Sequence, residues 1–180
     1  MVSDNDKRTE FNKEQQVKRP RVAKLLKWEA EKAVAEYLAK HHFLVLGTCE
    51  DNIPRTTVLA YASRGMTIYI FTGYTKTVKS IETNPNVSLG IYTELPYHPV
   101  QGVNYRGRAE ILRQNNPEFV EEWKVFCENP TLSREEPWAN MEFLKKMPRG
   151  ALLLKITPDE VALHDQSRED ALVVVWSKED

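Results

Sequence analysis

A succession of short strand-like stretches, most of them joined by compact turns, restricts the fold of this chain more than any other feature. The first three run from Phe43 to Phe71 and are separated by turns at 50–54 and 63–65. Turns this short join antiparallel neighbours, which predicts a meander. Further stretches of this kind lie at 87–93, 100–112, 151–156, 160–164 and 171–176. So many strands would present exposed edges unless the sheet closed, so we expect a closed antiparallel barrel.

Helical periodicity appears at a few points between these strands. Apolar residues recur at helical spacing from Val22 to Leu38, while lysines and glutamates take the other face. Shorter helices are expected at 75–83, 117–128 and 135–146. The sequence thus predicts a polar N-terminal tail at 1–16 and one domain at 17–180, mainly β with flanking helices and an N-terminal helix.

Composition excludes several classes of protein. The 180 residues are 41% hydrophobic and 28% charged with a net charge of −1, which argues against a disordered or nucleic-acid-coating chain. No apolar run approaches the roughly 20 residues that span a bilayer, and the N-terminus is polar, so we expect a cytoplasmic protein. Cys49 and Cys127 show no Cys-x-x-Cys spacing and are expected to be buried thiols, and the four histidines lack helical metal-site spacing, so no metal site is predicted.

The segment from Ile68 to Leu89 reads as strand, glycine turn, short helix, Asn-Pro stop and second strand. Its turn places Thr72, Thr75, Lys76 and Thr77 where a helix begins. Backbone N–H groups are unpaired there and the helix dipole is positive, so the turn could hold a phosphate. By itself the motif also fits a plainer interpretation, in which Thr75 only caps the helix and Lys76 is a solvated surface charge.

Taken in order, the parts of this chain resemble the flavin-binding split barrels of the pyridoxamine-phosphate-oxidase-like superfamily over roughly residues 33–165. The resemblance rests on the order and spacing of short motifs, which are Leu44–Thr48, Asp51–Pro54, a strand opening with Arg55, Tyr69–Thr72, Thr75–Thr77, Asn84–Leu89 and Tyr105–Glu110.

The resemblance implies a homodimer with FMN at the interface and the phosphate held at the turn after the third strand. Arginine can bind two phosphate oxygens at once, and hydroxyls and a lysine can add charge-assisted donors. The implied cofactor-binding residues are Arg55, Thr56, Thr57, Val58, Phe71, Thr72, Thr75, Lys76, Thr77 and Gln101. Gln101 is assigned as the residue that approaches the flavin of the other subunit.

Departures from the family pattern limit the expected activity. Where the true oxidases have a lysine five residues after the strand's arginine, this chain has Ala60. Where they have an Arg-Lys pair in the phosphate turn, it has Lys76 and Thr77, and the C-terminal Arg-x-His signature is absent. Pyridoxamine-phosphate oxidation is therefore not expected, and no catalytic residue is assigned.

Four functional alternatives follow. The first is an FMN-dependent oxidoreductase that passes hydride or electrons to or from an unidentified small molecule. The second is a flavin-binding sensor or carrier without turnover, suggested by the lack of residues that would grip a substrate. The third is a barrel that holds haem or a deazaflavin, for which His98 and His164 are the only hints. The fourth is a structural dimer with an empty groove.

Overall fold

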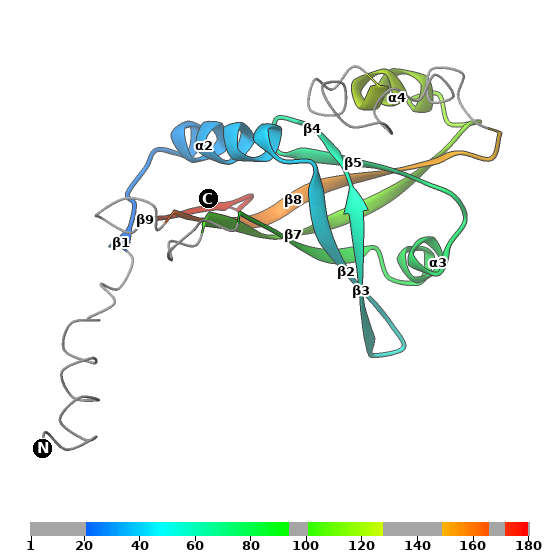
Figure 1. Ribbon diagram of the computed structural model, residues 1–180, viewed down its shortest axis with the longest axis horizontal. Coiled ribbons are helices and arrows are strands. Elements are labelled where there is room, and N and C mark those ends of the chain that lie inside the picture. Colours follow the sequence, from blue (N-terminus) through cyan, green and yellow to red (C-terminus); the bar gives the residue numbers. More distant parts are fainter. Residues whose placement is uncertain (1–20, 94–100, 128–148, 166–171, 180) are drawn as a thin grey trace, which may run out of the picture.

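The computed structural model describes residues 21–93, 101–127, 149–165 and 172–179, in which three helices pack against one nine-stranded sheet (Figure 1). The helices are α2 (Lys27–Lys40), α3 (Lys76–Thr83) and α4 (Phe119–Cys127). The strands are β1 (Arg21–Val22), β2 (Phe43–Glu50), β3 (Ile53–Ala60), β4 (Ala62–Arg64), β5 (Thr67–Thr72), β6 (Asn86–Thr93), β7 (Gln101–Arg113), β8 (Leu152–Asp165) and β9 (Leu172–Ser177).

Strand pairing confirms the expected mainly β fold of split-barrel type. Neighbours follow the order β1-β9-β8-β7-β6-β2-β3, and β5 pairs with both β4 and β8. Every pair is antiparallel except β1 with β9. The β2–β3 hairpin turns at Asp51 and Asn52, which both have positive φ, and it projects beyond the rest of the sheet (Figure 1).

The expected closure of the sheet is wrong. β3 pairs with β2 along its whole length, whereas β5 takes its partners from β4 and β8. The 14-residue β8 makes this possible, because β5 pairs with its first part, Leu152–Ile156, and β9 with its last, Glu160–Asp165. Within the described chain β3 is therefore an edge strand, and the sheet is split between β3 and β5.

β8 also corrects the expectation of two separate strands at 151–156 and 160–164. It runs unbroken past Pro158, which cannot donate a ladder hydrogen bond. The pairing register with β7 shifts between Arg106 and Gly107, so the irregularity is absorbed as a bulge opposite this proline. A Cβ atom at Gly107 would lie 2.2 Å from the Thr157 carbonyl oxygen, so the close approach at the bulge requires glycine.

The N-terminal helix begins later than its periodicity predicts. Arg21 and Val22 form β1 beside β9, and the Ala23 N–H donates to the Val173 carbonyl at 2.8 Å, which holds this segment extended. Helix α2 starts at Lys27, where the side chain of Glu29 accepts the N–H of the N-cap residue at 2.9 Å. The predicted tail at 1–16 and the predicted helix at 135–146 lie outside the described residues.

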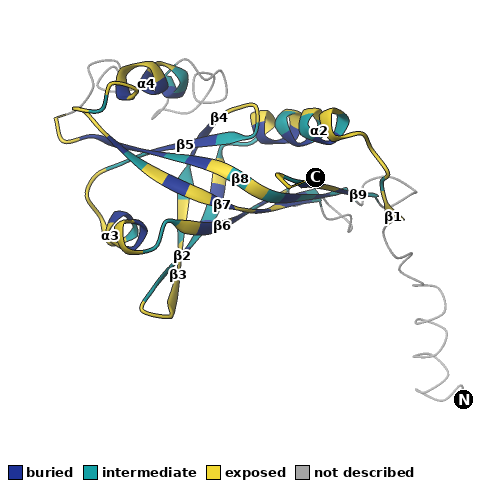
Figure 2. Cartoon of the chain, turned by 180° about the vertical axis from the view of Figure 1, so that it is seen from behind, coloured by how far each residue is buried: buried dark blue, intermediate teal, exposed yellow. Residues whose placement is uncertain are grey.

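Two clusters of buried side chains hold the layers together. The larger one joins α2 and α3 to one face of β2 and β6, as the buried stripe on α2 in Figure 2 illustrates. The smaller one lies under α4, where Phe119, Trp123 and Phe126 pack with Tyr69 and Leu153. Of the helices that the structure describes, none is long and apolar enough to cross a membrane.

Candidate functional site

The turn between β5 and α3 has the geometry that its sequence predicts. β5 ends at Thr72 and α3 begins at Lys76, with Thr75 as an extended N-cap residue (φ −118°, ψ 175°). The Thr75 side chain makes no capping hydrogen bond, so the plainer interpretation of this residue is incomplete. The N–H groups of the first helical turn have no intrahelical acceptor, and they are free to meet an anion here.

Strand β3 lies beside this helix start. The hydroxyl oxygens of Thr57 and Thr77 are 3.2 Å apart and share a hydrogen bond. Arg55 precedes Thr57 by two residues and so lies on the same face of β3. Arg55 and Lys76 are exposed, and among the residues described neither side chain has a hydrogen-bond or ion-pair partner. Two unpaired cations and two hydroxyls thus gather at one helix start.

The remaining residues predicted on β3 and β5 divide between two environments. Thr56 and Val58 lie on the opposite face of β3, opposite Gly47 and Val45 on β2, and Val58 is 68% exposed. Phe71 stacks edge-on against Trp123 of α4 with ring centroids 5.3 Å apart. The Phe71 side chain therefore packs against the smaller core cluster. At this position β5 can offer a ligand mainly its backbone groups.

Gln101 lies at the other end of the sheet. It opens β7, pairs with Thr93 of β6, and its carbonyl accepts a hydrogen bond from the Tyr37 hydroxyl at 3.2 Å. The end of α3, at Thr83, instead leads into the opposite end of β6, at Asn86, and the start of α3 adjoins β3. The assignment of Gln101 to a flavin requires a second subunit and stays a prediction.

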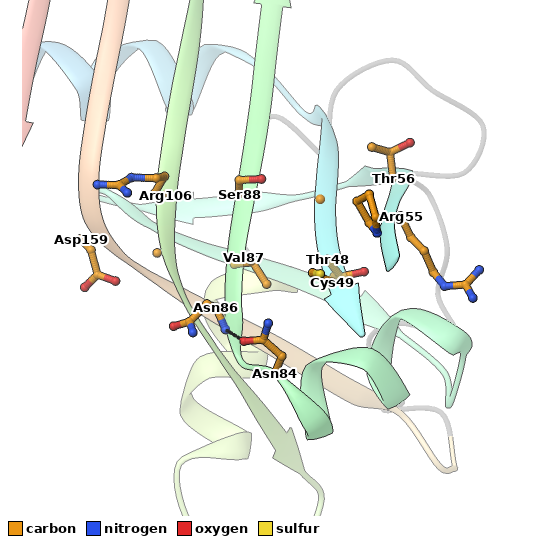
Figure 3. Close-up of a pocket in the computed structure, with 13 residues that line it drawn as sticks. Thr48, Cys49, Arg55, Thr56, Asn84, Asn86, Val87, Ser88, Arg106 and Asp159 are labelled. Atoms are coloured by element: carbon orange, nitrogen blue, oxygen red, sulfur yellow. Dashed lines mark hydrogen bonds between the residues drawn. The ribbon is translucent and has the colours of Figure 1, made fainter. Parts of the chain in front are cut away.

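A cavity of 560 Å³ adjoins Arg55 on the side of the sheet away from α2. Figure 3 shows Ser88, Arg106 and Asp159 around it, with the Arg55 side chain extending away from the other labelled residues. The sequence interpretation did not select these three residues. The alternation of residues along β6 and β7 could have identified two of them, since Ser88 and Arg106 are exposed residues between buried neighbours. The full lining is Gly47, Thr48, Cys49, Pro54, Arg55, Thr56, Asn84, Asn86, Val87, Ser88, Arg106, Gly107 and Asp159.

A second group of charges joins α4 to the sheet. The buried carboxylate of Glu122 accepts Arg64 Nη2 at 2.7 Å and Lys155 Nζ at 2.8 Å. Burial opposes ionisation of Glu122, but hydrogen bonds from Lys155 and Tyr69 outweigh it and hold its pKa below the usual 4.5. Burial, together with the bond to Glu122, raises the pKa of Tyr69 to about 12, so its hydroxyl remains a donor. These charges satisfy one another, which marks a structural junction.

No cluster of three or more potential metal ligands occurs in the described parts of the chain. Neither Cys49 nor Cys127 forms a disulfide and both are partly exposed, so the expectation that both are buried is wrong. Cys49 borders the cavity beside Arg55 because it lies on the outward face of β2.

The open sheet, split between β3 and β5, defines a split-barrel protein. Residues 30–165 match the family model described as pyridoxamine 5'-phosphate oxidase, and the chain belongs to this family. No curated protein sequence matches the chain.

Solved structures share the fold at low sequence identity. A conserved hypothetical protein of Mycobacterium tuberculosis is 19% identical with a TM-score of 0.58, over 82% of this chain and 84% of that one. An FAD-binding protein of Mesorhizobium loti is 19% identical with a TM-score of 0.53, over 76% and 90%. HutZ, the haem storage protein of Vibrio cholerae, is 12% identical with a TM-score of 0.56, over 72% and 89%.

Proposed function

We propose that this chain binds FMN, with the phosphate held between Arg55 of β3 and the first turn of α3. The observation that carries the proposal is the hydrogen bond between Thr57 and Thr77, which sets the edge strand against the helix start where Arg55 and Lys76 have no partner in the described chain. A phosphate dianion needs several charge-assisted donors, and this arrangement offers them from two elements. The side chain of Thr75, which makes no capping hydrogen bond, adds a further hydroxyl.

The residues around this turn then bind and orient the cofactor. Arg55 presents a planar fork that can pair with two phosphate oxygens, while the first-turn N–H groups of α3 offer fixed dipoles. Thr56, Thr57 and Val58 continue along β3 and supply backbone and apolar contacts for the ring. Phe71 and Thr72 border the same site from β5.

The activity we infer is that of an FMN-dependent oxidoreductase. When bound, FMN supplies hydride or single-electron transfer between a reductant and a small acceptor. No acid or base at this turn is required for that chemistry. Ala60 and Thr77 replace the lysines expected of a pyridoxamine-phosphate oxidase, so we propose a different small-molecule substrate.

We also propose that the chain works as a homodimer. Apolar side chains on and around the projecting hairpin and the outward sheet face are uncovered, with Phe43 49%, Ile53 56%, Val58 68% and Tyr92 69% exposed. A second copy would cover them, and Gln101 would then belong to the site of its partner. Sedimentation at micromolar concentration is expected to show a dimer, and a 20.9 kDa monomer alone contradicts it.

The absorption spectrum of the purified protein tests the cofactor. We expect the two-banded spectrum of oxidised flavin, released as FMN on denaturation. A Soret band would instead support haem, for which HutZ is the precedent, and a deazaflavin would be identified by the mass of the released compound. Steady-state oxidation of NADH or NADPH with an added acceptor then separates an enzyme from a flavin carrier without turnover.

A further inference from the structure

Glu82, on the last turn of α3, links the turn at the start of this helix to the end of β7. One of its carboxylate oxygens, Oε2, accepts the hydroxyl of Tyr74 at 2.8 Å. The other, Oε1, accepts Nη2 of Arg113, the last residue of β7. Tyr74 stands immediately before the N-cap residue Thr75. The carboxylate at the end of α3 therefore ties the residue before the helix start to the end of β7.

Little else holds Tyr74 in place. Its side chain is 64% exposed, so packing contributes little to its position. The preceding Gly73 is unhindered, since a Cβ atom there would meet nothing within 4 Å. Within the described chain, two side-chain hydrogen bonds restrain this short link: the Thr72 hydroxyl donates to the Gly73 carbonyl at 3.1 Å, and the Tyr74 hydroxyl donates to Glu82. Loss of the bond to Glu82 would leave a glycine-containing link with more conformations to lose when a ligand binds.

We infer that Tyr74, Glu82 and Arg113 are positioning residues that hold the β5–α3 turn in its phosphate-binding conformation. The inference rests on the proposed FMN site. It concerns which residues fix the conformation of that site, not which groups touch the ligand. Donors that are already ordered lose less entropy on binding, so this brace should raise affinity for the phosphate without contacting it.

The charge of Glu82 makes the inference testable by sign. A carboxylate near a site for a phosphate dianion repels it, so simple electrostatics predicts that Glu82→Gln binds FMN more tightly. A brace predicts the reverse, because glutamine pairs poorly with Arg113 and Tyr74 together. Tyr74→Phe removes the same hydrogen bond without any change of charge.

The experiment is fluorescence titration of FMN and of riboflavin into the parent, Tyr74→Phe, Glu82→Gln and the double variant. We expect each single variant to bind FMN about three- to tenfold more weakly. Riboflavin, which lacks the phosphate, should bind all four proteins equally. The double variant should be no weaker than the worse single one, since both remove one shared contact.

A matched control excludes general effects of the substitutions. Glu121→Gln removes the same charge as Glu82→Gln from an exposed ion pair on α4, away from the β5–α3 turn. It should bind FMN as the parent does. A parent that prefers FMN over riboflavin, together with Tyr74→Phe that keeps the full preference or Glu82→Gln that gains affinity, overturns the brace alone. A parent with no preference for FMN overturns the proposed function and the brace with it.

Discussion

Charged side chains in two regions beside β5 have opposite surroundings. At the junction with α4, the Glu122 side chain is only 8% exposed and meets both Arg64 and Lys155. At the start of α3, Arg55 and Lys76 are exposed and have no partner among the residues that the structure describes. One region has an anion enclosed by cations, whereas the other has cations without an anion.

The difference indicates what each region is for. A buried carboxylate is tolerated only when donors surround it, so the α4 junction contributes to the stability of the fold. Exposed cations beside a helix start contribute little to stability and are suited to an anion that arrives from solution. Substitutions in the two regions should therefore separate stability from binding.

The largest effect is expected at the paired region. Glu122→Gln removes the buried carboxylate that pairs with both Arg64 and Lys155, while Lys155 keeps its ion pair with Glu118 at 3.2 Å. The free energy of unfolding should therefore fall by about 3 kcal/mol, at the low end for a broken buried ion pair. Chemical denaturation of the parent and the variant measures this. The preference for FMN over riboflavin should survive, because the phosphate residues do not contact α4. A variant of unchanged stability that loses this preference would reverse the comparison.

The unpaired region should respond to ligand instead. FMN at about 100 times its Kd should add roughly 2.7 kcal/mol to stability, and riboflavin at the same concentration much less, because it lacks the phosphate. Thermal unfolding with each ligand compares the two. Equal shifts would show that the phosphate is not recognised.

A smaller effect concerns acid. The folded pKa of Glu122 lies below the usual 4.5, so its contribution is fully present above that pH and is lost as pH falls through the lowered value. The stability of the parent should therefore decline more steeply below about pH 4.5 than that of Glu122→Gln. Thermal unfolding across this range checks it, and parallel declines would argue against an ionised Glu122 in the folded state.

Local signals made the helix start predictable. Gly73, Thr75 and the Asn84–Pro85 stop are neighbours in sequence, and α3 occupies the expected residues. The hairpin turn at Asp51 and Asn52 also follows from residue types that accept positive φ. These elements could be predicted because the residues that determine them lie close together in the sequence.

Features that depend on distant partners were not predictable. The residues around Glu122 come from β4, β5 and β8 and share no spacing in the sequence. The sequence pattern predicted two strands at 151–156 and 160–164, and only the pairing of Pro158 with Gly107 of β7 shows why β8 continues between them. The open edge at β3 likewise depends on β8 being long enough to pair with both β5 and β9.

The central claim is that Arg55 binds the phosphate of FMN, and one titration tests it most directly. FMN and riboflavin are titrated by fluorescence quenching into the parent, Arg55→Ala and Lys79→Ala, an exposed lysine one turn further along α3. Arg55→Ala should bind FMN about ten- to a hundredfold more weakly, because it removes a hydrogen bond to a charged group, while riboflavin binding and Lys79→Ala change little. If Arg55→Ala binds FMN as the parent does and Lys79→Ala does not, the phosphate site lies on other residues than those proposed.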